Sequence, residues 1–235
     1  KETKIIDNME WFNYNLENEI PFGFARFNDG EMIGISQAHT MVARGDQYVD
    51  ETLRAALRSA LEHKQENYYI GVPCSLCYPM WSGLAKEIAG EDYVHLTKAV
   101  VTTNRNWKHF VDTFPEVMGD RRLIWIGGDD QDTEPLKEMG LNVVNTVKLP
   151  RRNSWDLYEG IKQKVPPIFQ PGDVVAISLG PTARVLVRDW FRDYPDITFI
   201  DIGSNMDPFT RGVRHNCHKG WEETGFNLGK PCTEC

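Results

Sequence analysis

The segment Arg26–Glu31 (RFNDGE) places two carboxylates, those of Asp29 and Glu31, on either side of a glycine. Two carboxylates at this spacing can face one point, where they repel each other unless a cation lies between them. Carboxylate oxygens suit Mg²⁺ and Mn²⁺, and such ions often bridge protein carboxylates to substrate phosphates. The alternative is a solvated Asp-Gly turn, with Glu31 in the first turn of a helix, where its charge favours the dipole.

The same segment carries groups that could bind a phosphate. Arg26 and Asn28 share one face of an expected strand, and the planar guanidinium of Arg26 could hold a phosphate through two parallel hydrogen bonds. Gly30 would let a ligand come close to the backbone because it has no side chain.

A second candidate segment, Ser178–Arg184 (SLGPTAR), follows an apolar run and opens a helix with a proline. The free N–H groups and the dipole of a helix N-terminus favour an anion. Thr182 and Arg184 would add a hydroxyl and a positive charge to that site. A plain turn between a strand and a helix is the alternative.

A third candidate is Asp201–Gly203, at the end of the last apolar run. A carboxylate at the end of a parallel strand lies on the side of the sheet where ligands bind. Asp201 could contact a sugar hydroxyl or act as a general base. The alternative is a residue that caps a helix or a turn.

The five cysteines fall into two C-x-x-C pairs and one single residue. This spacing is typical of zinc ligands. A candidate structural zinc site near the C-terminus consists of Cys217, His218 (or His215), Cys232 and Cys235, while Cys74 and Cys77 are expected in a loop near the ligand crevice. Unbonded thiols or a disulfide are the alternatives.

The chain has 235 residues, 41% hydrophobic and 26% charged, which is ordinary globular usage. The formal net charge of −8 argues against a protein that coats nucleic acid. No apolar run reaches the ~18 residues that a membrane span needs. The odd, sparse cysteine count is not typical of a secreted disulfide scaffold, so we expect a reducing, cytoplasmic setting.

Apolar periodicity predicts alternating strands and helices, which indicates an α/β fold with a Rossmann-like, mostly parallel sheet flanked by helices. Residues 1–206 are expected to form this domain, and residues 207–235 a Cys/His-containing C-terminal tail. The expected strands are 22–27, 68–72, 94–102, 123–126, 142–149, 173–179 and 197–202, and the expected helices are 3–19, 31–38, 46–65, 79–89, 104–118, 133–139, 153–164 and 183–194.

In their order along the chain, these segments resemble the GT-D type glycosyltransferases, a bacterial family of metal-dependent sugar transferases with a Rossmann-like fold. Arg26–Glu31 is similar to the family's Arg-Phe-Gly-Asp-Gly-Glu signature, with Asn28 in place of its first glycine. Gly180–Ala183 and then Asp201–Gly203 resemble later motifs, and Asn153–Trp155 looks like the family's Asn-Ala-Phe helix. Arg184 stands where lysine is usual, and the segment after Gly203 departs from the pattern.

The resemblance implies a glycosyltransferase of the hexosyltransferase type, with a nucleotide-diphosphate sugar as donor and a glycan or glycoprotein hydroxyl as acceptor. Asp29 and Glu31 would hold Mn²⁺ or Mg²⁺, and Asp201 or Asp207 could deprotonate the acceptor. A non-catalytic sugar-nucleotide binding protein and a metal-dependent phosphohydrolase are the alternatives. The candidate donor-binding residues are Arg26, Asn28, Gly30, Gly180, Pro181, Thr182, Arg184 and Gly203.

Overall fold

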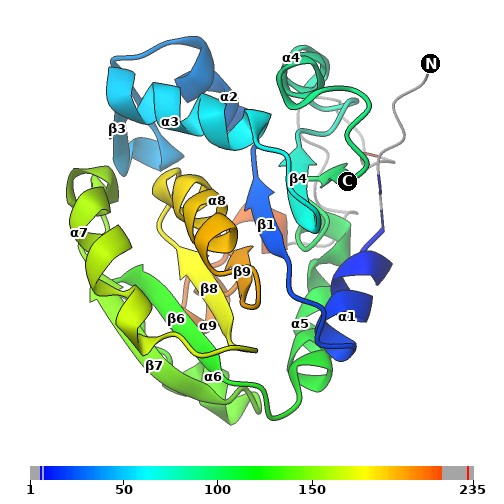
Figure 1. The fold of residues 1–235 in the computed structure, drawn as a ribbon, viewed down its shortest axis with the longest axis vertical. Helices are drawn as coiled ribbons and strands as arrows, with labels where there is room; N and C mark the ends of the chain where they lie inside the picture. Colours follow the sequence, from blue (N-terminus) through cyan, green and yellow to red (C-terminus); the bar gives the residue numbers. More distant parts are fainter. Residues whose placement is uncertain (1–5, 7, 219–231, 233–235) are drawn as a thin grey trace.

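The computed structural model describes residues 6, 8–218 and 232. Its main sheet has seven parallel strands in the order β5-β4-β1-β9-β8-β6-β7 (Figure 1). This confirms the expected α/β, Rossmann-like fold. The strands are β1 (Gly23–Arg26), β4 (Tyr68–Val72), β5 (Leu96–Lys98), β6 (Leu123–Gly128), β7 (Val143–Leu149), β8 (Val174–Ser178) and β9 (Thr198–Asp201).

Helices cover both faces of the sheet, and each face has its own apolar core. Successive strand residues point to opposite faces, so Ile124 and Ile126 of β6 join one core while Trp125, between them, joins the other. The first core lies under α2 (Asp29–Ser36), α3 (Glu51–Glu62), α4 (Pro79–Ala89), α7 (Tyr158–Lys164) and α8 (Thr182–Asp193). The second lies under α1 (Glu10–Glu17), α5 (Trp107–Met118), α6 (Glu134–Glu138) and α9 (Asp207–Thr210).

Helix α8 packs closely against the centre of the sheet. Trp190 and Phe191 on this helix are almost completely buried, and burying a large apolar side chain stabilises a fold by about 1.5–3 kcal/mol. Because α8 directly follows β8, its first turn is fixed at the carboxyl end of the sheet, where the second candidate segment lies.

Four expected helices begin several residues later in the structure, as α1, α3, α5 and α7, and the last two follow short 3₁₀ turns. Residues 46–50 of the expected helix 46–65 precede α3: Gln47–Val49 forms β3, which pairs antiparallel with β2 (Thr40–Val42), and the Asp50 side chain accepts the Leu53 N–H at 2.7 Å to cap α3. The expected helix 3–19 begins only at Glu10, and Ile6 forms a parallel bridge to Thr97 instead. Residues 3–5 and 7 lie outside the described part. Short 3₁₀ turns occupy Ala43–Gly45, Asn104–Asn106, Ser154–Leu157, Pro166–Ile168 and Asn216–His218.

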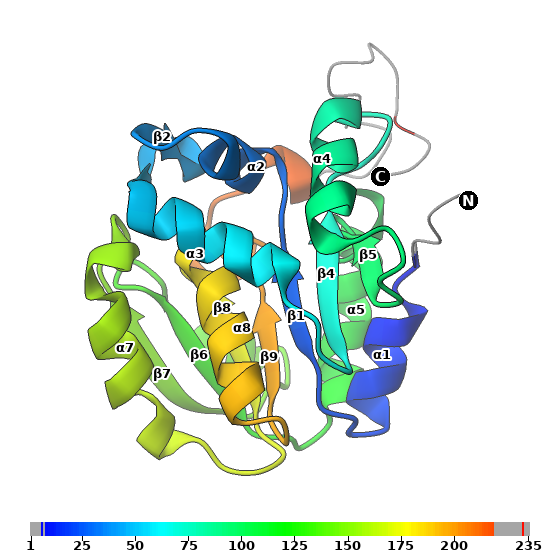
Figure 2. The same ribbon diagram turned by 45° about the horizontal axis from the view of Figure 1, so that its top comes forward.

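The strand order changes direction between β1 and β9, which is the topological switch point of the sheet. From β1 the chain adds β4 and β5 on one side, and it then crosses to build the remaining strands on the other. Ligands of open α/β sheets bind at such a switch point, beyond the carboxyl ends of the strands. Figure 2 shows α2 and the hairpin near this end of the sheet, above β1.

Among the residues that the structure describes, no helix combines the length and the apolar character needed to cross a membrane.

Candidate active site

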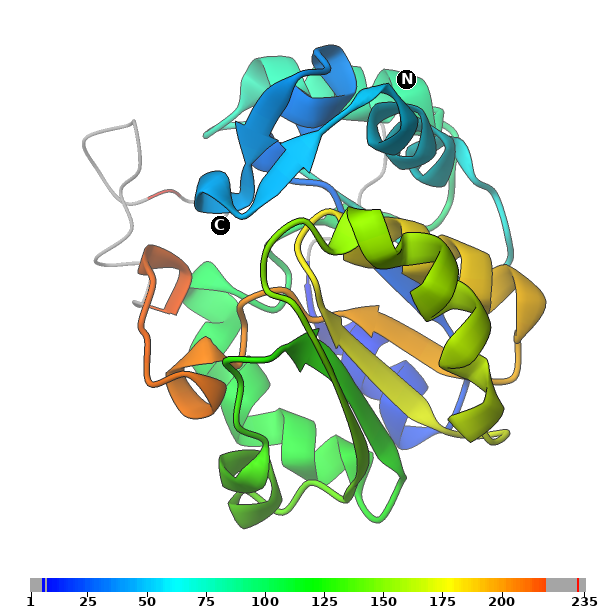
Figure 3. The same cartoon turned by 90° about the vertical axis from the view of Figure 1, so that its left-hand side faces the viewer.

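A cavity of about 700 Å³ opens at the carboxyl ends of β1, β8 and β9. Its walls come from distant parts of the sequence: α2 and the β2–β3 hairpin face the segment around α9 across it (Figure 3). It brings together most of the candidates named from the sequence. Those that line it are Arg26, Asn28, Asp29, Gly30, Glu31, Cys74, Cys77, Ser178, Gly180, Pro181, Arg184, Gly203, Asp207, His215 and Cys217.

One side of the cavity, here called the α2 wall, consists of residues 28–31 with Gly180 and Arg184. Asn28 precedes α2, and the Glu31 carboxylate accepts the Asn28 backbone N–H at 3.0 Å, as in a capping box. Asp29 is half-buried, whereas Glu31 is almost fully buried. Both acids therefore lie in the first turn of a helix at the cavity edge, as the alternative interpretation expects for Glu31, but Glu31 is buried and only Asp29 is partly exposed.

A buried cluster of charges fixes the α2 wall to the sheet. Arg184 contacts Glu31 at 3.2 Å through Nη2 and Asp201 at 3.0 Å through Nε. Its Nε also donates to the Arg26 carbonyl at 2.6 Å. Burial raises the pKa of Glu31, while the Arg184 charge lowers it. Removing one partner from such a cluster would leave the others as buried, uncompensated charges.

Asp201 lies beneath the cavity and does not line it. Its side chain has no exposed surface, and its Oδ2 accepts the Arg26 backbone N–H at 3.1 Å beside Arg184. The expectation that Asp201 touches an acceptor hydroxyl is therefore wrong for this structure, because two arginines and the neighbouring strand enclose the carboxylate. Thr182 is likewise fully buried, and its Oγ1 bonds to Ser154 Oγ at 2.9 Å, so it contacts no cavity ligand.

Arg26 reaches the floor of the cavity because the chain at Gly203 leaves space for it. A Cβ at Gly203 would lie 2.1 Å from Arg26 Nη2, and the φ of Gly203 is +52°, which side chains disfavour. Arg26 Nη1 donates to Asn205 Oδ1 at 2.9 Å. Burial lowers the pKa of Arg26, and the nearby Asp201 charge opposes this. Gly203 thus shapes the cavity floor by leaving room for the Arg26 guanidinium.

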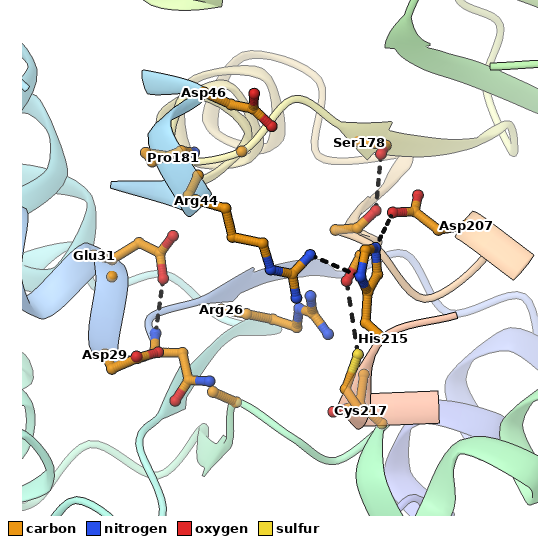
Figure 4. A pocket seen from close by; sticks show the side chains of 18 of the residues that line it. Arg26, Asp29, Glu31, Arg44, Asp46, Ser178, Pro181, Asp207, His215 and Cys217 are labelled. Atoms are coloured by element: carbon orange, nitrogen blue, oxygen red, sulfur yellow. Dashed lines mark hydrogen bonds and ion pairs between the residues drawn. The ribbon is translucent and has the colours of Figure 1, made fainter. Parts of the chain in front are cut away.

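The opposite side, here called the C-terminal wall, consists of residues 203–217. His215 Nε2 lies 2.9 Å from Asp207 Oδ2, and His215 Nδ1 lies 3.0 Å from Nη1 of the exposed Arg44 (Figure 4). Because arginine can only donate, Nδ1 accepts, and the neutral ring carries its hydrogen on Nε2, which donates it in a hydrogen bond to the Asp207 carboxylate. Asp207 is also held by Arg211 at 3.2 Å.

His215 and Arg44 are cavity residues that sequence reasoning missed. The sequence presents His215 only as an alternative zinc ligand, in a segment without periodicity, and Arg44 as an ordinary charge in a turn. The two residues are 171 positions apart in the sequence, so no local spacing signals their contact. Figure 4 shows His215 and Asp207 across the cavity from Asp29 and Glu31, with Arg26 and Arg44 between them.

The cavity is rich in arginine although the chain as a whole is acidic. Arginines outnumber the lining carboxylates of Asp29, Glu31, Asp46 and Asp207, and low-dielectric walls strengthen their attraction for an anion. This arrangement favours a ligand with more than one negative charge. The lining arginines are Arg26, Arg44, Arg151, Arg184, Arg211 and Arg214.

The cysteine ligand set expected from the sequence is divided by the fold. His218 binds backbone through both ring nitrogens, with Nε2 at 2.8 Å from the Ser204 carbonyl and Nδ1 accepting the His215 N–H at 2.9 Å. Cys217 lies beside Ser204 Oγ at 3.8 Å. The combination of Cys217 and His218 with Cys232 is therefore wrong, because Cys217 lies in the C-terminal wall and both ring nitrogens of His218 bind backbone groups. Cys232 lies instead beside Cys74 and Cys77, and Cys235 lies outside the described residues.

No family model matches the sequence, and no curated protein matches it. Three solved structures share its fold. One, described as "the highly conserved domain of unknown function 1792" with "a distinct glycosyltransferase fold", has a TM-score of 0.65 and 16% identity over 88% of this chain and 82% of the other. A selenomethionine-substituted structure of that domain gives 0.67 and 16% over the same shares.

The third structure is described as "A New Glycosyltransferase (DUF1792) from Streptococcus sanguinis". It has a TM-score of 0.65 and 19% identity over 88% of this chain and 85% of the other. At this level of identity the likeness concerns the fold. The chain therefore has the fold of these structures, in agreement with the fold that the sequence resemblance implies.

Proposed function

We propose that the protein is a metal-dependent glycosyltransferase that moves a hexose from a nucleotide-diphosphate sugar to a hydroxyl of a glycan or glycoprotein. The observation that carries this proposal is the composition of the cavity. Two acids on the α2 wall face a histidine–aspartate pair on the C-terminal wall, with arginines between them. The shared fold with structures described as glycosyltransferases supports the same conclusion.

The arginines fit a diphosphate donor. Arg26 is buried at the cavity floor, and Arg44 is exposed at its edge, so together they could contact an anion from two directions. A diphosphate leaving group gains negative charge as the sugar departs, and fixed cations stabilise that charge most strongly in a water-poor site. This role needs the guanidinium groups and no proton transfer.

The α2 wall fits Mn²⁺ or Mg²⁺ in a site completed by the substrate. Asp29 offers a carboxylate at the cavity edge, whereas the oxygens of Glu31 already contact Arg184 and the Asn28 N–H. One or two carboxylates plus substrate phosphates are a common arrangement for these ions. Asp29 would therefore be the principal protein ligand, and Glu31 would support it. A bound ion would act as a Lewis acid toward the diphosphate.

His215 is suited to accept the proton of the acceptor hydroxyl. Asp207 holds Nε2–H, which leaves Nδ1 as the basic nitrogen, and the imidazolium that forms would be stabilised by the Asp207 carboxylate. The acceptor oxygen would bond to the anomeric carbon, the bond from that carbon to the diphosphate oxygen would break, and the diphosphate would take the electron pair. Arg44, which now donates to Nδ1, would have to move aside.

A thermal-shift experiment tests this proposal. Uridine- and guanosine-diphosphate hexoses are added with and without Mn²⁺ to the wild-type protein, to Asp29→Ala and to Asp92→Ala, an exposed acid that does not line the cavity. A donor at about 100 times its Kd should stabilise the fold by about 2.7 kcal/mol. We expect a Mn²⁺-dependent shift that Asp29→Ala loses and Asp92→Ala keeps. The absence of a shift with every donor, or an equal shift in Asp29→Ala, would contradict the proposal.

A further inference from the structure

Three cysteines from two distant segments converge at the edge of the cavity. Cys74 and Cys77 follow β4, and Cys232 comes from the far end of the chain. Their three Sγ atoms all lie within 4.8 Å of one another. All three residues are buried, with at most 7% of their surface exposed. Val100 and the half-buried Tyr78 pack against them. The cluster is thus a set of soft ligands in an apolar pocket.

The sulfur separations fit a shared metal ion better than a disulfide. Cys74 Sγ and Cys232 Sγ are 3.6 Å apart, whereas a disulfide requires about 2.05 Å. A tetrahedral zinc ion with Zn–S bonds of about 2.3 Å holds its sulfurs roughly 3.8 Å apart. A pairwise thiol contact would explain one such distance, but it would not explain the convergence of three sulfurs.

The sequence around the cluster supports the same chemistry. Cys74 and Cys77 have the C-x-x-C spacing that lets two sulfurs bind one ion from a tight turn, and the Tyr78 N–H donates to the Cys74 carbonyl at 2.9 Å to close that turn. Cys232 begins a second pair of the same spacing. Thiolates select zinc over the hard cations that suit Asp29.

We propose that Cys74, Cys77 and Cys232 supply three of the four ligands of a structural Zn²⁺ ion, separate from the metal proposed at Asp29. The ion would join the loop after β4 to the C-terminal part of the chain. Because Cys74 and Cys77 also line the cavity, this link would fix part of the cavity edge. Zinc has no redox chemistry of its own, so its contribution is to folding and stability.

Metal analysis of the reduced, purified chain tests the proposal. We expect close to one zinc per chain in the wild type, and loss of most of it in Cys74→Ser, Cys77→Ser and Cys232→Ser. Cys217→Ser is the matched control, because Cys217 is half-buried in the cavity wall but does not belong to the cluster. It should keep its zinc.

A second measurement, on the wild type, tests the proposal even if the serine variants fail to fold. The wild type, stripped of zinc and titrated with Co²⁺, should develop the intense thiolate-to-cobalt charge-transfer absorption, which added zinc abolishes. Chelation should also lower the Tm. The proposal is overturned if the folded wild type neither contains nor takes up zinc, if iron occupies the cluster, if Cys217→Ser loses zinc as fully as Cys232→Ser, or if peptide mapping finds a Cys74–Cys232 disulfide.

Discussion

The α2 wall of the cavity is built from a strand end, a capped helix and a buried ion cluster, whereas the C-terminal wall is built from short turns between Gly203 and Cys217. In the first, Arg184 lies within 3.2 Å of both Glu31 and Asp201, below the surface. In the second, Asp207 and His215 meet at 2.9 Å beside the exposed Arg44. The α2 wall therefore has its charges compensated below the surface, whereas the C-terminal wall places a basic nitrogen in the cavity under an exposed arginine.

Because of this difference, we expect the α2 wall to contribute mainly to the stability of the fold and the C-terminal wall mainly to the reaction. Buried ion clusters are costly to break, so changes in the α2 wall should act first on folding. A histidine paired with a carboxylate contributes mainly to proton transfer. Substitutions in the C-terminal wall should therefore lower the reaction rate before they lower the stability of the fold. Asp29 is the exception on its wall, since it is half-buried and lines the cavity.

The largest expected effect is on catalysis, from His215→Ala. Loss of a general base commonly lowers kcat by about 10²–10⁴-fold, and the donor-induced thermal shift should change little because the arginines and Asp29 remain. Steady-state rates with the donor identified by the thermal-shift panel measure this, with the exposed His39→Ala as control. A kcat within twofold of wild type would remove His215 from the mechanism.

The next effect is on stability, from Arg184→Met. Removing this arginine leaves Glu31 and Asp201 buried without their partner, which should cost about 3–5 kcal/mol of unfolding free energy. Arg192→Met, on the same helix, removes an exposed pair with Asp193 and a longer contact, 3.6 Å, with the buried Asp189. Asp189 keeps Lys162 and Arg188 as partners, so the cost should be less than about 1 kcal/mol. Urea unfolding compares the two. Equal losses would show that the buried cluster does not stabilise the α2 wall.

A smaller effect is expected where the two walls meet, from Gly203→Ala compared with Gly212→Ala. Both glycines have positive φ, +52° and +67°, but only a Cβ at position 203 meets another group, Arg26 Nη2 at 2.1 Å. The extra loss at 203 should be about 1–3 kcal/mol, from overpacking, together with weaker donor binding. Thermal unfolding of both variants measures the difference, and equal losses would mean that Arg26 moves aside freely.

The sequence was sufficient to predict the strands and the Arg26–Glu31 part of the α2 wall, because both are local, whereas the contacts of Arg184 with Glu31 and Asp201 are long-range. Apolar periodicity predicts the strands within a few residues, and α4 begins and ends where expected, at Pro79 and Ala89. Arg26 to Glu31 lie on one strand and the helix that follows it, so their spacing alone places them at one edge. The β2–β3 hairpin was missed because its strands have only three residues each and precede the helical pattern of α3 directly.

The C-terminal wall could not be predicted in the same way. Asp201 looks like a cavity residue from its position at a strand end, but Arg184 approaches from α8, the helix before that strand, and encloses it. His215 and Arg44 acquire their roles only by long-range contact. The partner of Cys232 is likewise set by the tertiary fold, which brings it to Cys74 and away from Cys217.

The most direct test of the proposed function is the product formed from the donor. Wild-type protein with Mn²⁺, a uridine- or guanosine-diphosphate hexose and a mixture of glycan acceptors is followed by mass spectrometry, beside Asp29→Ala. We predict release of the nucleoside diphosphate with the gain of one hexose by an acceptor, slowed roughly 100-fold or more in Asp29→Ala. Release of inorganic phosphate or nucleoside monophosphate, no release from any donor by folded protein, or undiminished release in Asp29→Ala would contradict the account.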